Sequence, residues 1–312
     1  MSTGGGLPAR VALTEVGPRD GLQNEARPVP TEAKVAFVRG LVAAGLRDIE
    51  VTSFVRPDRV PQLADGAAVL AALGPPPEGV TYSALVPNAR GYEAARAAGV
   101  AKVAVFTAAS ETFSHRNTHA SIAGSLQRFA PVVRSAAADG RSVRGYVSCA
   151  VACPFEGPIA PAAVERVALE LLELGCEEVS IGDTIGAATP PDIARLLDVL
   201  LGRIDRDHLV LHLHDTRGMA IANVVQGLQH GITAYDASAA GLGGCPFAPG
   251  ASGNLATEDV VFLLDGLGIA HGVDLEALRR ASDVLEAHLG HPFAGRVRQA
   301  PPLPRGPGAD AS

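Results

Sequence analysis

The chain has 312 residues, of which 47% are hydrophobic and only 4% aromatic, and its formal net charge is -7 at pH 7. This composition is typical of a globular protein with an aliphatic core. The net negative charge gives no electrostatic reason to bind nucleic acid or an acidic membrane surface, so we expect neither as a partner.

Eight short runs of β-branched and aliphatic residues alternate with longer Ala/Leu-rich segments of helical periodicity. Strands are expected at residues 10–16, 48–53, 80–86, 102–107, 143–151, 178–183, 208–214 and 234–240. Helices follow them, for example at residues 31–44, 122–138, 161–174, 190–201 and 257–267. Thr189 directly precedes two prolines, so we expect it to cap the helix that begins at Pro190.

The repeated βα units predict an α/β fold with parallel strands, because parallel neighbours need a crossover connection. Eight units favour a closed (β/α)8 TIM barrel over an open sheet, and no GxGxxG motif follows the first strand as a Rossmann fold would require. A further amphipathic segment at residues 274–289 predicts an extra C-terminal helix. We expect one catalytic domain over residues 8–290, with flexible tails at 1–7 and 298–312.

The amino terminus lacks the basic start and apolar stretch of a secretory signal, and no run is apolar for long enough to span a bilayer. We therefore expect a cytoplasmic protein. The four cysteines, Cys149, Cys153, Cys176 and Cys245, include no CxxC pair, so reduced thiols are the expectation.

Two histidines, His212 and His214, lie two residues apart at the end of the seventh expected strand. Side chains alternate across a strand, so both imidazoles can reach one point and chelate a metal ion. A solitary strand histidine is more often a satisfied core residue, and the pair therefore needs further ligands. Asp20 follows the first strand and Asn254 follows the eighth, and barrel active sites gather at these carboxyl ends. Two nitrogen and two oxygen ligands favour Mg²⁺ or Mn²⁺, although imidazoles would also suit zinc.

Other reactive residue types are expected at the same mouth of the barrel. They are Arg19, Glu50, Ser53, Asn88, Arg144 and Asp183. Each alone has an ordinary explanation, such as a surface ion pair or a helix cap. Arg19, beside Asp20, would place fixed hydrogen-bond donors next to the ion and stabilise a developing oxyanion or enolate.

The loop GLGGCPFAPGASGN at residues 241–254 is the other unusual feature. Long loops in compact domains are disproportionately functional. Cys245 at its centre could supply or remove a proton if the nearby ion and arginine adjust its pKa.

Several long strings, in this order, resemble the 3-hydroxy-3-methylglutaryl-CoA lyase family over nearly the whole barrel. They are EVGPRDGLQNE at 15–25, EVTSFV at 50–55, VPQLAD at 60–65, RGYVSCAVACPFEG at 144–157, IGDTIG at 181–186, HLHDTRG at 212–218 and AGLGGCPFAPGASGNLATEDV at 240–260. The resemblance implies a divalent-metal-dependent retro-Claisen cleavage of 3-hydroxy-3-methylglutaryl-CoA to acetyl-CoA and acetoacetate, in leucine catabolism. An acyl-CoA substrate and a homodimer are implied in the same way.

The resemblance also assigns roles to individual residues. It implies metal ligation by Asp20, His212, His214 and Asn254, with Arg19 as the enolate-stabilising cation, Cys245 as the proton-transfer thiol, and Glu50 and Asp183 as supporting acids. The group that takes the proton of the substrate hydroxyl stays open between Asp20, Asp183, His212 and a metal-bound water.

Three alternatives remain at this point. A lyase for a longer or branched 3-hydroxyacyl-CoA would use the same site with a different acyl pocket. A condensing synthase that resembles isopropylmalate or homocitrate synthase would form the carbon–carbon bond, but this chain has no extra regulatory domain and carries the cysteine loop instead. A noncatalytic scaffold would bind divalent ions and leave CoA thioesters intact.

Overall fold

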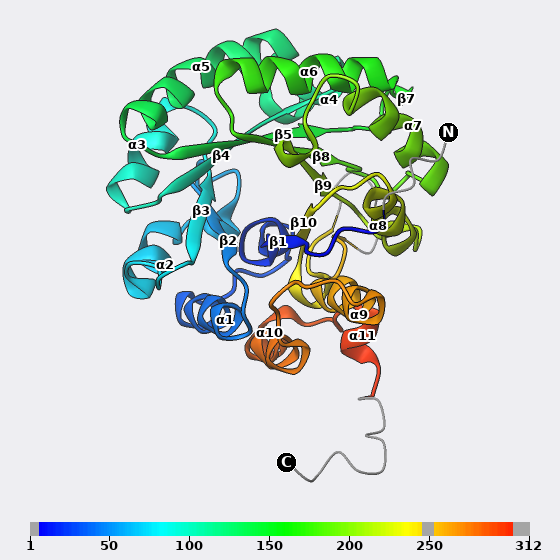
Figure 1. The fold of residues 1–312 in the computed structure, drawn as a ribbon. Helices are drawn as coiled ribbons and strands as arrows, with labels where there is room; N and C mark the ends of the chain where they lie inside the picture. The colour runs from blue at the N-terminus through cyan, green and yellow to red at the C-terminus, as the bar shows by residue number, and fades with distance from the viewer. Residues whose placement is uncertain (1–5, 245–252, 302–312) are drawn as a thin grey trace.

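The computed structural model describes residues 6–244 and 253–301. In these residues eight parallel strands close into a barrel, with helices around it (Figure 1). The strands are β1 (Ala12–Glu15), β2 (Asp48–Ser53), β3 (Thr81–Leu85), β4 (Lys102–Ala108), β5 (Ser142–Ser148), β8 (Glu178–Gly182), β9 (Leu209–His212) and β10 (Ala234–Ala237). Their order is β1-β10-β9-β8-β5-β4-β3-β2, and β1 pairs with β2 to close the ring. The predicted TIM barrel is confirmed.

Several of the predicted strands end earlier than their apolar runs, and β10, for example, ends at Ala237 and not at residue 240. β5 stops before Cys149, whose φ of 59° departs from extended backbone. The residues beyond it form a small antiparallel pair that the sequence did not predict, β6 (Ala152–Cys153) and β7 (Gly157–Pro158). β9 stops short of His214, which instead forms an isolated antiparallel bridge with Asn254.

Helices cover the outside of the barrel, as Figure 1 shows. They are α1 (Thr31–Ala43), α2 (Gly66–Leu73), α3 (Ala89–Ala97), α4 (Glu111–Thr118), α5 (Ile122–Ala138), α6 (Pro161–Leu174), α7 (Pro190–Leu200), α8 (Ala220–Gln229) and α9 (Thr257–Leu267). The expected cap of α7 is present: the Asp192 carboxylate accepts hydrogen bonds from both the backbone N–H and the hydroxyl of Thr189. In the described part of the chain, no helix has the length and apolar character that crossing a membrane requires.

The extra C-terminal helix is α10 (Leu275–Leu289), which packs against α1 and α9. Asp274 caps it by accepting a hydrogen bond from the N–H of Ala277. A short helix, α11 (Arg296–Gln299), follows and contacts α9. The boundary that we expected at residue 298 therefore falls inside a helix that packs on the barrel.

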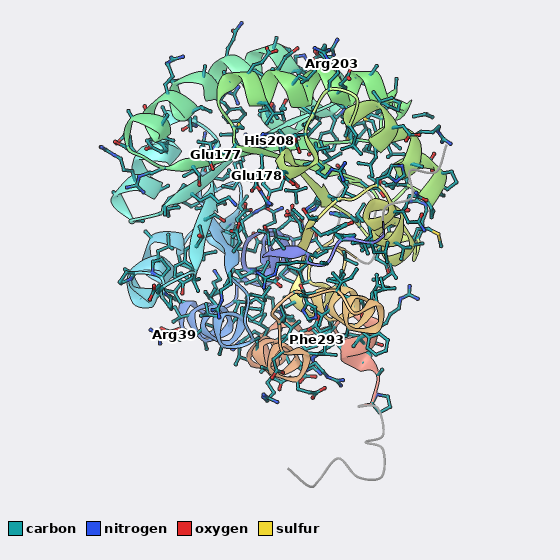
Figure 2. All side chains as sticks on the ribbon, in the orientation of Figure 1. Arg39, Glu177, Glu178, Arg203, His208 and Phe293 are labelled. Atoms are coloured by element: carbon teal, nitrogen blue, oxygen red, sulfur yellow. The ribbon has the colours of Figure 1, made fainter. Side chains whose placement is uncertain are left out.

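A buried polar network fills the barrel interior below the carboxyl ends of the strands. Arg144 is its centre and donates to Glu178, Asp236 and Thr14. Glu178 lies near the middle of the barrel in Figure 2, whereas Arg39 and Arg203 lie at the periphery. Our placement of Arg144 at the mouth of the barrel was therefore wrong. Arg144 is the third residue of β5, so its side chain lies in the barrel interior, below the residues at the carboxyl ends of the strands.

Candidate active site

Four polar side chains from three parts of the chain converge at the carboxyl end of the barrel. Asp20 lies in the π-helical turn η1 (Gly17–Gly21), directly after β1. His212 is the last residue of β9, and His214 follows two residues later. Asn254 lies after β10 and forms an isolated antiparallel bridge with His214. The ligand atoms of Asp20, His212 and His214 all lie within 4.8 Å of one another. The two histidine Nε2 atoms are 3.1 Å apart, and the Asn254 amide nitrogen lies 2.9 Å from Asp20 Oδ2.

Asp236 fixes the orientation of the His212 ring from below. Burial alone would raise the pKa of Asp236, but the charge of Arg144 and the hydrogen bond from His212 hold it well below its ordinary value. The ionised carboxylate therefore accepts the Nδ1–H of His212 at 3.1 Å. This bond leaves His212 Nε2 facing Asp20 and His214, with its lone pair available when the ring is neutral.

His214 is held in its neutral form. Burial, helped by the charge of His212, lowers the pKa of His214 to about 4. Burial alone would raise the pKa of Asp20, but the charge of Arg19, the largest opposing cause, holds it below its ordinary value. For Asp20 and His214, these are the protonation states in which such side chains ligate a metal ion. Burial alone would lower the pKa of His212, but its hydrogen bond to Asp236 and the charge of Asp236 raise it, so a cation bound there would displace a proton.

Two buried ligand-type atoms in this cluster have no hydrogen-bond partner among the described residues, His214 Nδ1 and Asn254 Oδ1. Buried polar atoms are normally satisfied, so such atoms call for an explanation. The cluster thus fits a small cation in the chemistry and number of its donors.

The backbone also comes unusually close to Asn254. A Cβ on Gly243, whose φ is 120°, would lie 2.6 Å from Asn254 Nδ2, so only glycine fits there.

Arg19 lies beside this cluster in a chain of buried charges. Its guanidinium donates to both Asp20 and Glu50, and Glu50 also accepts the hydroxyl of Tyr146 at 3.0 Å. Burial alone would lower the pKa of Arg19, but the charges of Glu50 and Asp20 raise it above its ordinary value. Arg19 also lies 5.4 Å from the centre of the Tyr146 ring. The cation is therefore permanent and tightly oriented.

The remaining expected residues are placed differently. Asp183 is buried, and its two carboxylate oxygens accept the N–H groups of Ala187 and Ala188, so it fixes the connection between β8 and α7. It is not among the residues that line the cavity described below. Burial raises the pKa of Asp183. Cys245 lies outside the described residues.

A cavity of about 620 Å³ opens onto the cluster. Arg19, Asp20, His212, His214 and Tyr146 line it where the polar groups converge. Apolar walls come from Val55, Leu85, Phe106 and Phe113, and basic side chains come from Arg56, Arg59, Arg116 and Arg128. An apolar cavity with a few convergent polar groups is the usual form of a small-molecule site.

Sequence reasoning missed two residues of this site, Tyr146 and Asp236. Tyr146 lies two positions after Arg144 on β5, so the alternation along the strand could have placed it on the inward face. Asp236 is a charged residue within the run AYDA of β10, and a carboxylate in an interior strand needs a partner. No local signal identified His212 as that partner, since the two are 24 residues apart.

The chain is similar in sequence to one protein family and to proteins of known activity within it. The model of the HMGL-like family matches residues 10–285. A hydroxymethylglutaryl-CoA lyase of Pseudomonas mevalonii is 52% identical over 280 residues, which cover 90% of this chain and 93% of that protein. A 3-hydroxy-3-isohexenylglutaryl-CoA/hydroxymethylglutaryl-CoA lyase of Pseudomonas aeruginosa is 50% identical over 294 residues, 94% of this chain and 98% of that one.

A solved structure agrees with these relatives. The crystal structure of hydroxymethylglutaryl-CoA lyase from Pseudomonas aeruginosa superimposes with a TM-score of 0.91 at 50% identity. The match covers 94% of this chain and 97% of that one.

Proposed function

The chain belongs to the HMGL-like family, and we propose from its site and its relatives that it cleaves 3-hydroxy-3-methylglutaryl-CoA to acetyl-CoA and acetoacetate. The single observation that carries this proposal is the cavity that opens onto Arg19, Asp20 and the two histidines. Those residue types suit a reaction in which negative charge develops on substrate oxygens.

In this reaction the 3-hydroxyl group loses its proton and becomes the ketone of acetoacetate. The bond between C2 and C3 breaks, and its electron pair forms the enolate of acetyl-CoA. The enolate carbon then takes a proton. The protein therefore has three tasks: to accept one proton, to stabilise an enolate, and to return one proton to carbon.

We propose that Asp20, His212, His214 and Asn254 hold a divalent cation. The cation would act as a Lewis acid that stabilises negative charge on the substrate oxygens. The Asn254 amide nitrogen donates to Asp20 Oδ2 and to the carbonyl of Leu242, whereas its buried Oδ1 accepts no hydrogen bond from the described residues. The free amide oxygen supports this assignment, because it is available to a cation. Oxygen and imidazole donors without a thiolate favour Mg²⁺ or Mn²⁺.

Arg19 is the proposed enolate-stabilising cation. Its contacts with Glu50 and Asp20 orient the guanidinium before substrate arrives, so little reorganisation is needed during the reaction. Glu50 acts as a positioning residue, because it holds Arg19 and Tyr146 and does not itself line the cavity.

The proton transfers involve different residues. Cys245 is the proposed donor to the enolate carbon. For the hydroxyl proton, Asp20 and His212 line the cavity, whereas both oxygens of Asp183 accept backbone N–H groups. The contacts therefore favour Asp20 or His212 over Asp183, which we propose acts by holding its loop.

The cavity also suits the rest of an acyl-CoA. Arg56, Arg59, Arg116 and Arg128 line it, and guanidinium groups are well matched to phosphates. We further propose a role in leucine degradation, a cytoplasmic location and a homodimer.

A second candidate substrate is a 3-hydroxyglutaryl-CoA with a longer alkyl or alkenyl group at C3. Val55, Leu85 and Phe106 give the cavity an apolar wall, and the name of the Pseudomonas aeruginosa relative includes such a substrate. Metal-loaded protein should be incubated with 3-hydroxyglutaryl-CoA thioesters that carry methyl, butyl or isohexenyl groups at C3, while acetyl-CoA release is measured. Release from the methyl compound alone supports the main proposal. Comparable release from all three supports the broader substrate range, and no release from any would contradict both.

A further inference from the structure

Glu15 is a buried carboxylate at the end of β1 whose three hydrogen bonds reach three different segments. Its Oε1 accepts the N–H of Gly17 and the N–H of Ala239, both at 2.8 Å. Its Oε2 accepts the hydroxyl of Thr257 at 2.7 Å. Glu15 is fully buried and lines no described cavity, so none of these bonds serves substrate directly.

Each of the three partners begins or borders a segment that carries site residues. Gly17 begins the η1 turn, which places Arg19 and Asp20. Ala239 begins the short 3-10 turn η4 (Ala239–Gly241), and Thr257 begins α9. Asn254 lies in the segment between η4 and α9. One carboxylate therefore joins the segment that carries Asp20 to both flanks of the segment that carries Asn254.

The packing around this carboxylate is tight. A Cβ on Gly17 would lie 2.6 Å from Glu15 Oε1 and 3.2 Å from Ser238 Oγ. The turn can therefore approach the carboxylate this closely only because residue 17 is glycine. Ser238 also accepts the N–H of Thr257 through its carbonyl, which ties the start of α9 to the end of β10.

A second buried acid, Glu258, supports the same turn from the other side. Its Oε2 accepts the N–H of Ala240, which adopts a left-handed φ of 61°. The carbonyl of Ala240 in turn accepts the N–H groups of Ala294 and Gly295. Burial raises the pKa of Glu15 to about 7 and that of Glu258 to about 8, and the charge of Glu15 contributes to the latter. A glutamine, which is neutral and has the same shape, is therefore compatible with the position of Glu15.

We propose that Glu15 is a positioning residue that sets the separation of Asp20 and Asn254 by clamping the segments on which they lie. The amide–carboxylate contact of 2.9 Å between these two residues is the result of that clamp. The inference rests on the proposed function in one respect, the assignment of Asp20 and Asn254 as ligands of a divalent cation.

The test compares four variants of the full chain after removal of metal with EDTA. Glu15→Ala removes the clamp, and Glu15→Gln keeps its shape, since an amide oxygen can accept from Gly17 and Ala239 while its NH₂ donates to the Thr257 hydroxyl. Thr257→Val removes only the bond to α9. Thr107→Val is the matched control, because Thr107 is also buried and bonds one side chain, Ser125, away from the site.

The dissociation constant for Mn²⁺, measured by the loss of the free-ion electron paramagnetic resonance signal, is the main measurement, with the thermal midpoint alongside it. We expect Glu15→Ala to weaken Mn²⁺ binding at least about tenfold and Thr257→Val about fivefold, the usual effect of one hydrogen bond. Glu15→Gln should restore binding to within about threefold of wild type. Thr107→Val should lower the thermal midpoint without changing Mn²⁺ affinity.

Wild-type affinity in Thr257→Val, with the same thermal loss as Thr107→Val, would overturn the proposal even if Glu15→Ala fails to fold. A Glu15→Gln variant as weak as Glu15→Ala would also overturn it, because charge and not position would then be the cause. Wild-type protein that binds Mn²⁺ but releases no acetyl-CoA would refute the proposed function and leave the clamp supported by these affinities. Wild-type protein that binds no Mn²⁺ would refute both.

Discussion

The imidazole of His212 donates its Nδ1–H to Asp236 at 3.1 Å, and Asp236 is in turn bonded to Arg144 and Ser180. Hydrogen bonds thus connect the candidate metal site to the charged network inside the barrel. A histidine whose second nitrogen is held by a carboxylate has a fixed tautomer and ring orientation and is a better ligand.

Asp236→Asn should weaken divalent metal binding by about 10- to 100-fold, because an amide cannot hold His212 as an ionised carboxylate does. The substitution also removes one of the negatively charged partners of Arg144. Isothermal titration with Mn²⁺ measures this effect. Ser180→Ala removes a different partner of the same carboxylate and should change the affinity much less. Equal affinity in Asp236→Asn and wild type would mean that His212 needs no such support.

His214→Ala should lower the metal content of the purified protein, since it removes one of the converging nitrogen donors. Metal per chain is measured by inductively coupled plasma mass spectrometry. His208→Ala, at an exposed position, is the matched control and should retain the wild-type content. Unchanged stoichiometry in His214→Ala would count against its role as a ligand.

Cys245→Ala should reduce kcat by about 10²- to 10⁴-fold, because the proposed proton donor to the enolate carbon is lost. The metal content should stay the same, because the proposed metal ligands are retained. Acetyl-CoA release and metal analysis of the same sample measure both quantities. Cys176→Ala replaces a buried thiol outside the cavity lining and should keep full activity. Full turnover by Cys245→Ala would remove this thiol from the mechanism.

Glu258→Gln should stabilise the protein at alkaline pH. The pKa of Glu258 is raised to about 8 by burial, so between its ordinary value and this one the folded chain binds more protons than the unfolded chain. The contribution of Glu258 to stability therefore falls as pH rises through this window, by up to about 1 kcal/mol per pH unit. The glutamine variant has no such loss.

The difference in thermal midpoint between this variant and wild type should accordingly grow from pH 6 to pH 8, by roughly 2–4 °C per kcal/mol. Glu173→Gln on the exposed face of α6 serves as the control and should show no pH-dependent difference. A midpoint difference for Glu258→Gln that stays constant across this range would contradict the assignment.

Much of the fold could be read from the sequence because its signals are local. The βα alternation predicts the barrel, and α5, α6 and α9 have the predicted bounds of 122–138, 161–174 and 257–267. The predicted strand ends were less accurate, since hydrophobic runs continue past the point where Cys149 leaves extended backbone.

The candidate site could be predicted in part for a different reason. Residues that follow barrel strands meet at one end whatever their separation in sequence, which is why Asp20 and the two histidines converge as expected. Depth in the barrel and the choice of hydrogen-bond partner depend on long-range packing. For that reason Arg144 was assigned to the wrong level, Asp236 was missed, and the bonds of Asp183 to the backbone were not foreseen.

We propose that one cation held by Asp20, the paired histidines and Asn254 makes cleavage of the carbon–carbon bond possible. The most direct measurement is acetyl-CoA release from 3-hydroxy-3-methylglutaryl-CoA by protein stripped of metal, before and after Mn²⁺ is restored. We predict no measurable turnover without metal, recovery with Mn²⁺, and no recovery in His214→Ala at the same Mn²⁺ concentration. Full turnover by protein shown to be metal-free would contradict the claim.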